Sequence, residues 1–496
     1  MKPIISFFFF IAFTGIAAPS FSRQADIEQI KTEVTQTDAE MNIYFLASDE
    51  LRGRDTGTHE LDVAARYIAT WFRANGIGLI PGQESYFQDV PLRLHRPAEQ
   101  ARFVLDDSVY TLHDDIISMN KPSGTVQAPA LYLQYATPEE ITEHDVEGKI
   151  VITSVGFPGQ STPGQFISAS RKKIEALSGA GAAGLVELYV NRQYSWRVLV
   201  NYASNESVTL DPYGPEKTSI PHIWFNAMQK PIPVNQIDGK SAEITIEGPD
   251  SRHFTSRNVL GFVEGADPDL KEEIILLSAH YDHTGVAKNR EDGNYIFNGA
   301  RDNAVGISAI MQAARYLAQH PPRRSILIAA WTAEEKGLLG SGWFAENPQV
   351  PLNKIVYNLN IDGAGYNDTT KVTVIGLERT GASDELTSAA EAFGLEAIGD
   401  PAPEQNLFDR SDNVNFAQQG IPSPTYSMGF TAFDDEINYY YHRVTDEPDT
   451  INYDYVTSYI RSYVLAVIKV ANREEAPFWL PGDVYEEAGI ELYGRE

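Results

Sequence analysis

Three apolar runs, separated by longer segments, most constrain the fold of this chain. They are EIILLSAHYDH (273–283), RSILIAAW (324–331) and KIVYNLNID (354–362), and each is typical of a strand buried on both faces. A helical pattern, NAVGISAIMQAARYLAQ (303–319), lies between the first two runs and ends before a pair of prolines. Buried strands that alternate with helices predict an α/β fold with a mainly parallel mixed sheet and helices on both of its faces.

The rest of the chain divides into an α/β domain and an insert. Residues 99–250 contain short β runs between turn residues, such as ARFVL, GKIVITSV and AEITIEG, and predict a separate β-rich domain. We therefore expect 23–98 and 251–476 to form the α/β domain, followed by a surface tail at 477–496. Other elements are expected as helices at 60–77, 170–184 and 456–472 and as a strand at 85–94.

One glycine pattern in the insert imitates a cofactor-binding motif. GAGAAG (179–184) has the spacing of a dinucleotide-binding loop, but such a loop follows a strand and begins a helix. Here a helical pattern precedes the glycines, and the apolar run LVELYV follows them. We interpret the glycines as the turn at the end of a helix, and we expect no nucleotide cofactor.

The N-terminus has the pattern of a secretory signal peptide. Lys2 precedes a short apolar stretch, and Ser20 and Ser22 fit the −3 and −1 positions of a cleavage site, which predicts removal of residues 1–22. The stretch is short for a membrane span, so a retained anchor is the less favoured alternative. We expect a bacterial protein exported to the periplasm or the medium, without membrane attachment after cleavage.

Charge and cysteine content exclude several classes of protein. Asp and Glu number 68 against 39 Lys and Arg, a formal net charge of −29, and no basic cluster would attract nucleic acid locally. The chain contains no cysteine, which excludes disulfides, thiol catalysis and cysteine-ligated zinc. Stability must therefore come from the apolar core or from bound metals.

Acidic and imidazole side chains recur where the predicted strands end. They are His280 and Asp282 after the first strand, Asp302 before the helix, Glu334 and Glu335 after the second strand, Asp362 after the third, and His442 late in the chain. Taken singly, each has an ordinary explanation, such as a helix cap for Asp302. Together they fall at the carboxyl ends of strands, where open α/β sheets form ligand sites. The sequence thus predicts a metal site at this edge.

The set of donors favours two metal ions over one. Two histidines with four or five carboxylates, and no sulfur, suit Zn²⁺, Mn²⁺ or Co²⁺. A catalytic zinc takes three protein ligands, whereas two metals that share a carboxylate need about five. A single-metal site with additional acidic neighbours stays open on this count. The motifs H-E-x-x-H and G-x-S-x-G and the P-loop are absent from the sequence.

Five sequence blocks resemble the secreted di-zinc aminopeptidase family, which includes relatives of vacuolar aminopeptidase and of plasma glutamate carboxypeptidase. The blocks are AHYDH, NGARDNAVG, TAEEKGLLGS, NLNIDGAG and YYHR. The opening segment 46–72 is also similar to that family, and PFWLPGD fits its bacterial branch. VEGKIVITSV with KIEALSGAGAAGLVEL resembles the protease-associated domain that many members carry as an insert. The resemblance implies a zinc exopeptidase fold with 99–250 as that domain.

The resemblance also implies a role for each candidate residue. It implies His280 and Asp362 as ligands of one zinc, Glu335 and His442 as ligands of the other, Asp302 as the bridging ligand, Asp282 as the carboxylate that orients His280, and Glu334 as the general base.

Two further positions, Tyr441 and Arg410, are matched less securely by the resemblance. Tyr441 would stabilise the oxyanion, and Arg410 would contact the substrate, as in some members of the family. The family implies a cis peptide bond at Asp302–Asn303. Arg301 stands where relatives often have a small or acidic residue, and the sequence does not predict its effect.

The end of the peptide substrate that the site holds is the main open alternative. A free amine needs a nearby carboxylate, and the acidic segment FTAFDDEINYY (430–440) precedes His442, which favours an aminopeptidase. A carboxypeptidase or dipeptidase, a glutaminyl cyclase and a non-catalytic receptor-like protein are alternatives, the last less favoured because every implied ligand position is filled. Side-chain preference, the role of 99–250 and the oligomeric state are not predicted.

Overall fold

The chain folds into two compact units. The structure, a computed structural model, describes residues 20–119, 123–191, 194–211, 220–287 and 293–495. One unit comprises residues up to Val90 together with Ser256–Glu496, and the other is Pro91–Thr255. The second unit thus extends a few residues beyond the predicted insert on both sides. Two strands, β1 (Phe87–His95) and β11 (Ser251–Val263), pass from one unit into the other.

The N-terminal region is described only in part. Residues 1–19 of the predicted signal peptide lie outside the described residues, and the first helix of the structure begins at Ser20. Within the described part of the chain, every helix is too short or too polar to cross a membrane.

A mixed sheet forms the centre of the first unit. Its strand order is β16-β15-β17-β14-β12-β13-β11-β1. The central strand β12 runs parallel to β13 and β14, while β11 is antiparallel to β13 and β15 is antiparallel to β17. The predicted α/β architecture is therefore confirmed. The remaining strands are β12 (Ile274–His280), β13 (Ser325–Trp331), β14 (Ile355–Ile361), β15 (Lys371–Ile375), β16 (Glu396–Ile398) and β17 (Thr425–Met428).

The central strands are apolar throughout because both faces of the sheet are covered. Successive side chains of a strand point to opposite faces. Along β12, Ile275 and Leu277 belong to one core, and Ile274 and Leu276 belong to a second core on the other face. Continuous apolar runs in the sequence are the direct consequence of this double burial.

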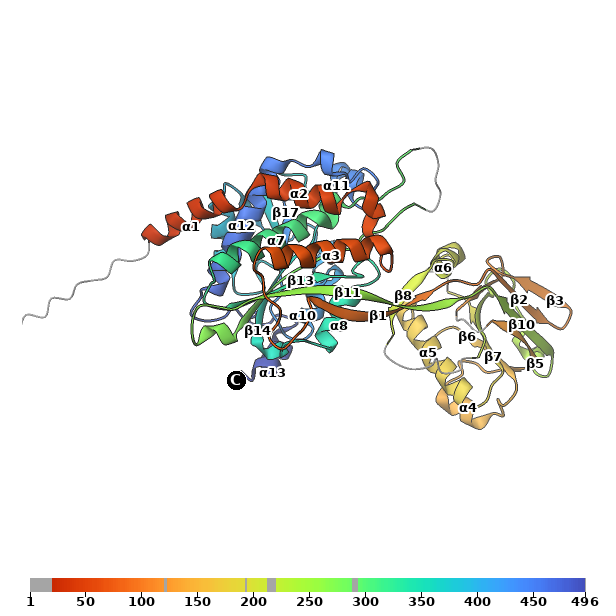
Figure 1. Cartoon of the computed structure of the whole chain (residues 1–496). Coiled ribbons are helices and arrows are strands. Elements are labelled where there is room, and N and C mark those ends of the chain that lie inside the picture. The colour runs from red at the N-terminus through yellow and green to blue at the C-terminus, as the bar shows by residue number, and fades with distance from the viewer. Residues whose placement is uncertain (1–19, 120–122, 192–193, 212–219, 288–292, 496) are drawn as a thin grey trace, which may run out of the picture. The chain divides into compact units, whose positions relative to one another are not determined.

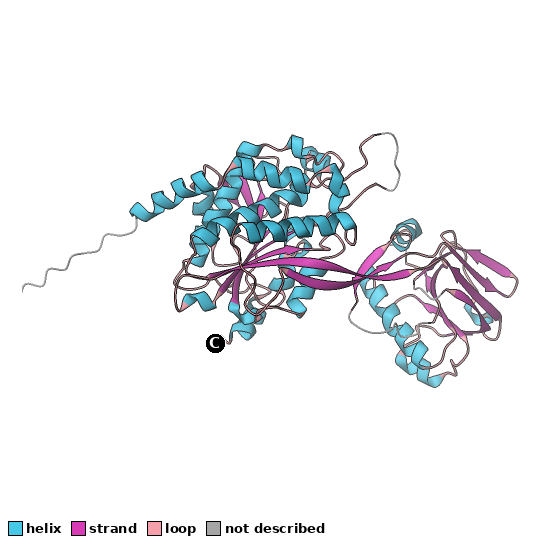
Figure 2. Cartoon of the chain, in the orientation of Figure 1, coloured by secondary structure: helices cyan, strands magenta, loops and turns pink. Residues whose placement is uncertain are grey.

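Helices supply the partners for both cores (Figures 1 and 2). The core that contains Ile275 receives side chains from α1 (Ser20–Glu33), α2 (Gln36–Leu46), α3 (His59–Ala74), α7 (Val305–Gln319), α9 (Ser383–Glu391) and α12 (Tyr453–Ala471). The core that contains Ile274 receives them from α8 (Leu339–Glu346), α10 (Asn413–Ala417) and α13 (Glu486–Tyr493). A short helix, α11 (Asp435–Tyr440), precedes His442.

The C-terminal segment is packed, so the prediction of a surface tail at 477–496 is wrong. Trp479 is buried and donates from Nε1 to the Gly420 carbonyl at 2.8 Å. Tyr493, on α13, donates to the Ile355 carbonyl at 2.6 Å. Large aromatic side chains with a polar tip favour such sites, because they bury apolar area and still find a hydrogen-bond partner.

The second unit contains its own sheet and core. The strand order is β3-β2-β10-β5-β6-β7-β9-β4, and β8 pairs with the end of β1. Its strands are β2 (Gln100–Leu105), β3 (Ser108–Thr111), β4 (Ile116–Ser118), β5 (Gly124–Tyr132), β6 (Ile150–Ser154), β7 (Gly184–Tyr189), β8 (Ser207–Leu210), β9 (His222–Asn226) and β10 (Ser241–Glu247). Its helices are α4 (Pro138–Glu143), α5 (Pro163–Gly179) and α6 (Trp196–Ala203).

Helix α5 begins earlier than the predicted 170–184. The Thr162 hydroxyl accepts a hydrogen bond from the backbone N–H of Gln165, and the backbone N–H of Thr162 donates one to the Gln165 side chain in a capping box. The helix therefore starts at Pro163, seven residues ahead of the predicted Ser170. The helix ends at Gly179, and β7 follows the glycine turn. The order helix, glycines, strand is the reverse of a dinucleotide-binding loop, as predicted.

A buried charged network lies inside the second unit. The Glu187 carboxylate accepts hydrogen bonds from Ser170 Oγ, from Lys173 Nζ at 2.8 Å and from Trp224 Nε1 at 2.9 Å, and His222 Nε2 lies 2.8 Å away. Burial raises the pKa of Glu187, but His222 and Lys173 outweigh this effect and lower the pKa to about 2. The carboxylate is therefore ionised and stabilised by its partners.

We predict that Glu187→Gln lowers the free energy of unfolding by about 3–5 kcal/mol, because it leaves the buried Lys173 ammonium unpaired. Glu243→Gln removes a partly exposed pair with Arg102 and is expected to cost under about 1 kcal/mol. Urea unfolding followed by tryptophan fluorescence measures both. The folded pKa of Glu187 is depressed, so its contribution is complete above pH ~4.3 and is lost as the pH falls toward 2. Equal losses in the two variants would contradict the assignment.

Candidate metal centre

The carboxyl ends of three parallel strands bring the candidate residues together. His280 is the last residue of β12, Asp362 follows β14, and Glu335 lies in the turn after β13. The register pairs Ala279 with Ile361, so His280 and Asp362 are neighbours across two strands. Parallel strands in register end at one edge of the sheet, which explains why residues far apart in sequence meet there.

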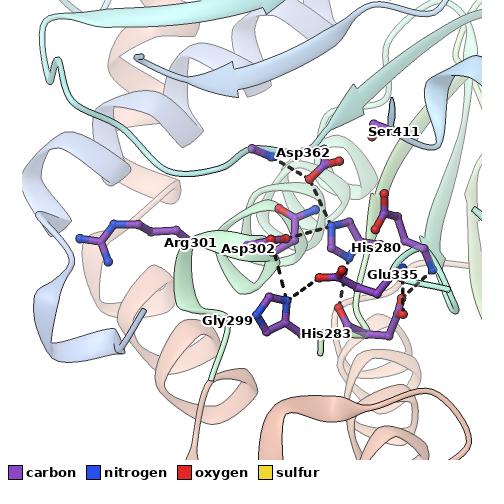
Figure 3. A network of polar contacts seen from close by, with 12 residues as sticks. His280, His283, Gly299, Arg301, Asp302, Glu335, Asp362 and Ser411 are labelled. Atoms are coloured by element: carbon purple, nitrogen blue, oxygen red, sulfur yellow. Dashed lines mark hydrogen bonds and ion pairs between the residues drawn. The ribbon is translucent and has the colours of Figure 1, made fainter. Parts of the chain in front are cut away.

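A first group joins His280, Asp302 and Asp362. His280 Nε2 lies 3.2 Å from Asp302 Oδ1 and 3.2 Å from Asp362 Oδ1 (Figure 3). His280 Nδ1 donates to the Asp282 carbonyl oxygen at 3.1 Å, and in the neutral imidazole this leaves the Nε2 lone pair directed at the two carboxylates. Such a contact between acceptors is favourable when a cation lies between them.

A second group shares Asp302 with the first. Its other carboxylate oxygen, Oδ2, lies 3.1 Å from His442 Nε2, which is also 3.4 Å from Glu335 Oε2. Each oxygen of Asp302 thus faces a different imidazole, His280 on one side and His442 on the other. The two groups therefore share one carboxylate.

The second group contains a histidine that sequence reasoning missed. His283 is fully buried, and its Nδ1 atom lies 2.7 Å from Glu335 Oε1 and 3.9 Å from Asp302 Oδ2 (Figure 3). His283, Asp302 and Glu335 together have the spacing of metal ligands. The only clue in the sequence was the second histidine of AHYDH.

Among the described residues, no hydrogen bond joins the Asp282 carboxylate to the His280 ring, which differs from the expectation of the resemblance. The Asp282 backbone carbonyl accepts from His280 instead. The carboxylate is fully buried and accepts from the backbone of Glu334 at 3.0 Å and of Glu335 at 3.3 Å, and from Thr56 Oγ1 at 3.0 Å. Because the chain turns sharply after β13, this one carboxylate can hold the backbone of both glutamates.

Arg301 fixes the backbone that carries Asp302. Its guanidinium donates to Asp446 Oδ1 at 3.1 Å and lies 3.6 Å from the centre of the Tyr440 ring. Asp446 Oδ2 in turn accepts from the backbone N–H of Asp302 at 3.2 Å. The peptide bond Asp302–Asn303 is cis, as the resemblance implied.

The electrostatics of the cluster match its geometry. Burial raises the pKa of Asp302, but His283, His280 and His442 outweigh burial and hold that pKa well below its usual range. Burial raises the pKa of Glu334 well above its ordinary value; His280 opposes this, whereas Asp362 adds to it. Asp302 is therefore the carboxylate that stays ionised, and Glu334 is the one that can take up a proton.

The residues present fit divalent metal ions. Among the described residues, Glu335 Oε1 and both ring nitrogens of His283 are buried without a hydrogen-bond partner. Buried carboxylates crowd around imidazoles, which leaves negative charge and lone pairs uncompensated. Oxygen and nitrogen donors of this kind, without sulfur, are those that zinc binds.

A small apolar pocket adjoins the cluster at Asp362. It has a volume of about 80 Å³, and Arg410 and Tyr441 are among its lining residues. The Tyr441 ring stacks on His442 with ring centroids 4.1 Å apart, and burial raises the pKa of its phenol. The remaining lining is largely apolar and comprises Ala364, Ile375, Leu407, Phe430 and Phe433, with Gly363, Ser411, Thr425 and Ser427.

Arg54 is a second residue that sequence reasoning missed. It is fully buried and donates to the carbonyls of Leu46, Tyr281 at 2.8 Å, Asn298 at 2.7 Å and Gly299 at 3.0 Å. Burial lowers the pKa of Arg54 to about 10, and nearby carboxylates oppose that shift. The guanidinium therefore joins the N-terminal segment to two of the loops that carry metal-binding candidates, those of His280 and of Asp302.

The segment that carries the site matches a known protein family. Residues 258–467 match the family model described as Peptidase family M28. The described site residues from His280 to His442 all lie in this range. The resemblance inferred from the sequence blocks is thus confirmed, because the segment that carries the site matches this peptidase family.

Individual relatives agree with this class. The chain is 25% identical over 227 residues to Aminopeptidase YwaD of Bacillus subtilis, covering 45% of this chain and 46% of that protein. It is 33% identical over 113 residues to the Vacuolar membrane protease of Saccharomyces cerevisiae, covering 23% of this chain and 10% of that protein. The matched segments thus span less than half the length of these curated relatives.

A solved structure shares the fold over most of the chain. It is an aminopeptidase from Aneurinibacillus sp. strain AM-1, with a TM-score of 0.56 at 18% sequence identity. The similarity covers 92% of this chain and 98% of that one. The α/β fold expected from the sequence is the fold of this aminopeptidase.

We predict that Arg54→Met lowers the free energy of unfolding by roughly 3 kcal/mol, because buried carbonyls lose a charged donor. Arg52→Met, two residues away, removes only a partly exposed contact with Glu60 at 3.6 Å and is expected to cost under about 1 kcal/mol. Thermal unfolding of the metal-free protein measures both. Similar stability of the two variants would show that Arg54 does not hold these loops together.

Proposed function

We propose that the chain is a zinc-dependent aminopeptidase that binds two metal ions and releases N-terminal residues from peptides. The observation that carries the proposal is the division of Asp302 between two groups, with Oδ1 toward His280 and Oδ2 toward His442. A single-metal site has no need for a carboxylate placed in this way. A bridging carboxylate between two such groups is typical of two-metal hydrolases.

The ligands follow from the two groups. His280 and Asp362 would hold one zinc, Glu335 and His442 would hold the other, and Asp302 would bridge them, as the resemblance implies. When bound, such metals lower the pKa of a water molecule and polarise a carbonyl group. Mn²⁺ and Co²⁺ accept the same donors and are expected to substitute.

Glu334 is the proposed general base. It belongs to neither ligand group, yet burial places its pKa well above the ordinary value. A carboxylate with such a pKa takes a proton from the attacking water and delivers it to the departing amine. The Asp282 carboxylate holds the backbone of Glu334 and Glu335, so it positions base and ligand together.

Tyr441 is the proposed donor to the developing oxyanion. Burial raises the pKa of its phenol, so the hydroxyl stays protonated and can donate a hydrogen bond. Stacking on His442 fixes the ring beside the second ligand group.

The apolar pocket is the proposed site for the side chain of the terminal residue. Its walls of Ile375, Leu407, Phe430 and Phe433 favour an aliphatic side chain, and its volume of about 80 Å³ limits the size. A charged side chain would lose its hydration there, and these apolar walls offer it no group of opposite charge.

A different carboxylate from the one expected supports binding of the amino end of the peptide substrate. Asp434 of the acidic segment caps α11, accepting from the backbone of Glu436 and Ile437, so it is not free to bind an amine. The carboxylate that does line the pocket is Asp362. A free amine beside Asp362 would gain an ion pair, which supports the aminopeptidase.

A carboxypeptidase or dipeptidase is the second candidate, because Arg410 also lines the pocket. A guanidinium binds a terminal carboxylate in a bidentate manner. We favour the first candidate because Arg410 is exposed, whereas Ile375 and Phe430 are buried and the other apolar wall residues are half-buried.

The cellular setting of the proposal follows from the sequence. The predicted signal peptide places the enzyme in the bacterial periplasm or medium, where it would act on peptides. The second unit corresponds to the proposed protease-associated domain.

We predict that Glu334→Gln and Glu335→Gln fail in different ways. Glu334→Gln is expected to keep its metal and to lose kcat by about 10²–10⁴-fold, because proton transfer is removed. Glu335→Gln is expected to lose metal, because an amide is a poor zinc ligand. Metal content by mass spectrometry and hydrolysis of a leucyl chromogen measure the two effects. Near-normal kcat in metal-loaded Glu334→Gln would show that another group is the base.

We predict that a free N-terminus and an aliphatic first residue are both required. A peptide beginning with Leu is expected to react roughly 100-fold faster than its N-acetylated form. The acetylated form has no charged amine and so loses the proposed ion pair with Asp362. The same peptide beginning with Asp is expected to react slowly. Product identification by mass spectrometry over peptides blocked at either end checks this.

The variant Arg410→Met separates the two candidates. An aminopeptidase is expected to keep most of its activity on a C-terminally amidated leucyl peptide after this change. If amidated peptides are inert and Arg410→Met abolishes hydrolysis of free ones, the enzyme holds the carboxyl end instead. A chelator is expected to stop either reaction.

A further inference from the structure

His283 occupies a position in the metal centre that the family ligand set does not explain. It is fully buried three residues after His280, in the loop that follows β12. Among the described residues, neither of its ring nitrogens has a hydrogen-bond partner. A buried imidazole without partners is costly, so the ring calls for an interaction that the protein atoms alone do not provide.

The contact between His283 and Glu335 is a contact between two acceptors. Nδ1 lies 2.7 Å from Glu335 Oε1, yet the two atoms do not have the alignment of an N–H···O bond, and Oε1 also lacks a partner. Lone pairs on nitrogen and on a carboxylate oxygen repel each other at this distance. A cation between them removes the repulsion and satisfies both atoms.

The surroundings fix the ring in this orientation. The backbone N–H of His283 donates to the Arg54 carbonyl at 3.2 Å. Gly299, at φ +62, lies so close that a Cβ atom there would be 2.6 Å from His283 Cδ2. A glycine therefore makes room for the ring, and the ring cannot turn in that direction away from Glu335.

The opposite side of the same space is bounded by His442. The two imidazole rings have centroids 5.6 Å apart and an interplanar angle of 69°. His442 Nε2 faces Asp302 Oδ2 and Glu335 Oε2. His283 Nδ1 faces Oε1 of the same glutamate (Figure 3). Two imidazoles thus converge on one glutamate from different sides.

We propose that His283 is an additional ligand of the second metal position, binding through Nδ1 alongside Glu335, His442 and Asp302. The inference rests on the proposed two-metal function. It makes the two positions unequal, because the first has one imidazole, from His280, and the second has two. The position richer in nitrogen is expected to hold zinc or cobalt more tightly.

The alternative role for His283 is to orient Glu335 by a hydrogen bond without touching the metal. Partners of that kind typically change metal affinity by about 10–100-fold. Affinity alone therefore does not separate the two roles, and the test must detect the bond between nitrogen and metal.

Nuclear magnetic resonance of the protein labelled with ¹⁵N-histidine and loaded with ¹¹³Cd detects that bond directly. We expect three imidazole nitrogens split by coupling to cadmium, from His280, His283 and His442, with His283 coupled through Nδ1. Two coupled imidazoles, without His283, would overturn the proposal. This measurement uses the native chain, so it stands even where a substitution prevents folding.

The variant His283→Asn tests the same assignment by loss of metal. Its amide can still donate a hydrogen bond to Glu335 but is a poor zinc ligand, so we expect one of two bound metals to be lost on dialysis. The control variant is His320→Asn. His320 follows the C-terminal end of α7 and pairs with Glu33, and we expect this variant to retain both metal ions. Two metals of unchanged affinity in His283→Asn would contradict the role as ligand.

Failure of this inference and failure of the proposed function are distinguishable. Cadmium coupling and metal content are measured without any substrate. If His283 is coupled to cadmium but the zinc enzyme releases no amino acids, the function is wrong and the ligand stands. If leucyl peptides are cleaved while His283 shows no coupling, only the ligand assignment is wrong.

Discussion

The concentration of buried negative charge at one edge of the sheet is the constraint on which the rest of this structure depends. Asp362, Glu334 and Glu335 meet there because three parallel strands end in register, and the turn before α7 adds Asp302. Buried carboxylates repel one another strongly, so the arrangement requires positive charge nearby. The protein supplies part of it through the imidazoles and through Arg54, and the proposed metals supply the remainder.

The supporting contacts act mainly on the backbone of the acidic loops. Arg54 donates to carbonyls of two loops, Asp282 accepts from the N–H groups of two glutamates, and Asp446 accepts from the N–H of Asp302. Side chains that ligate metal then need few contacts of their own. A backbone held in this way is expected of a preorganised site.

The parts of the structure that depend on local periodicity were predictable. Strands β12, β13 and β14 each begin within one residue of the predicted start, because a doubly buried strand is apolar at every position. Arg54 was missed because its loop partners lie 227 to 245 residues away and no local pattern links them. His283 was missed because its orientation depends on the turn after β12, and Trp479 because its partner Gly420 is distant in sequence.

The order in which the chain is made has a consequence for when the centre is complete. Segment 46–54 and the strand ends emerge before His442 and Asp446, which lie near the carboxyl end. A nascent chain that stops before His442 lacks one residue of the second group, and it also lacks Asp446, which holds the backbone of Asp302. The proposed activity would thus arise only when nearly all of the chain has left the ribosome.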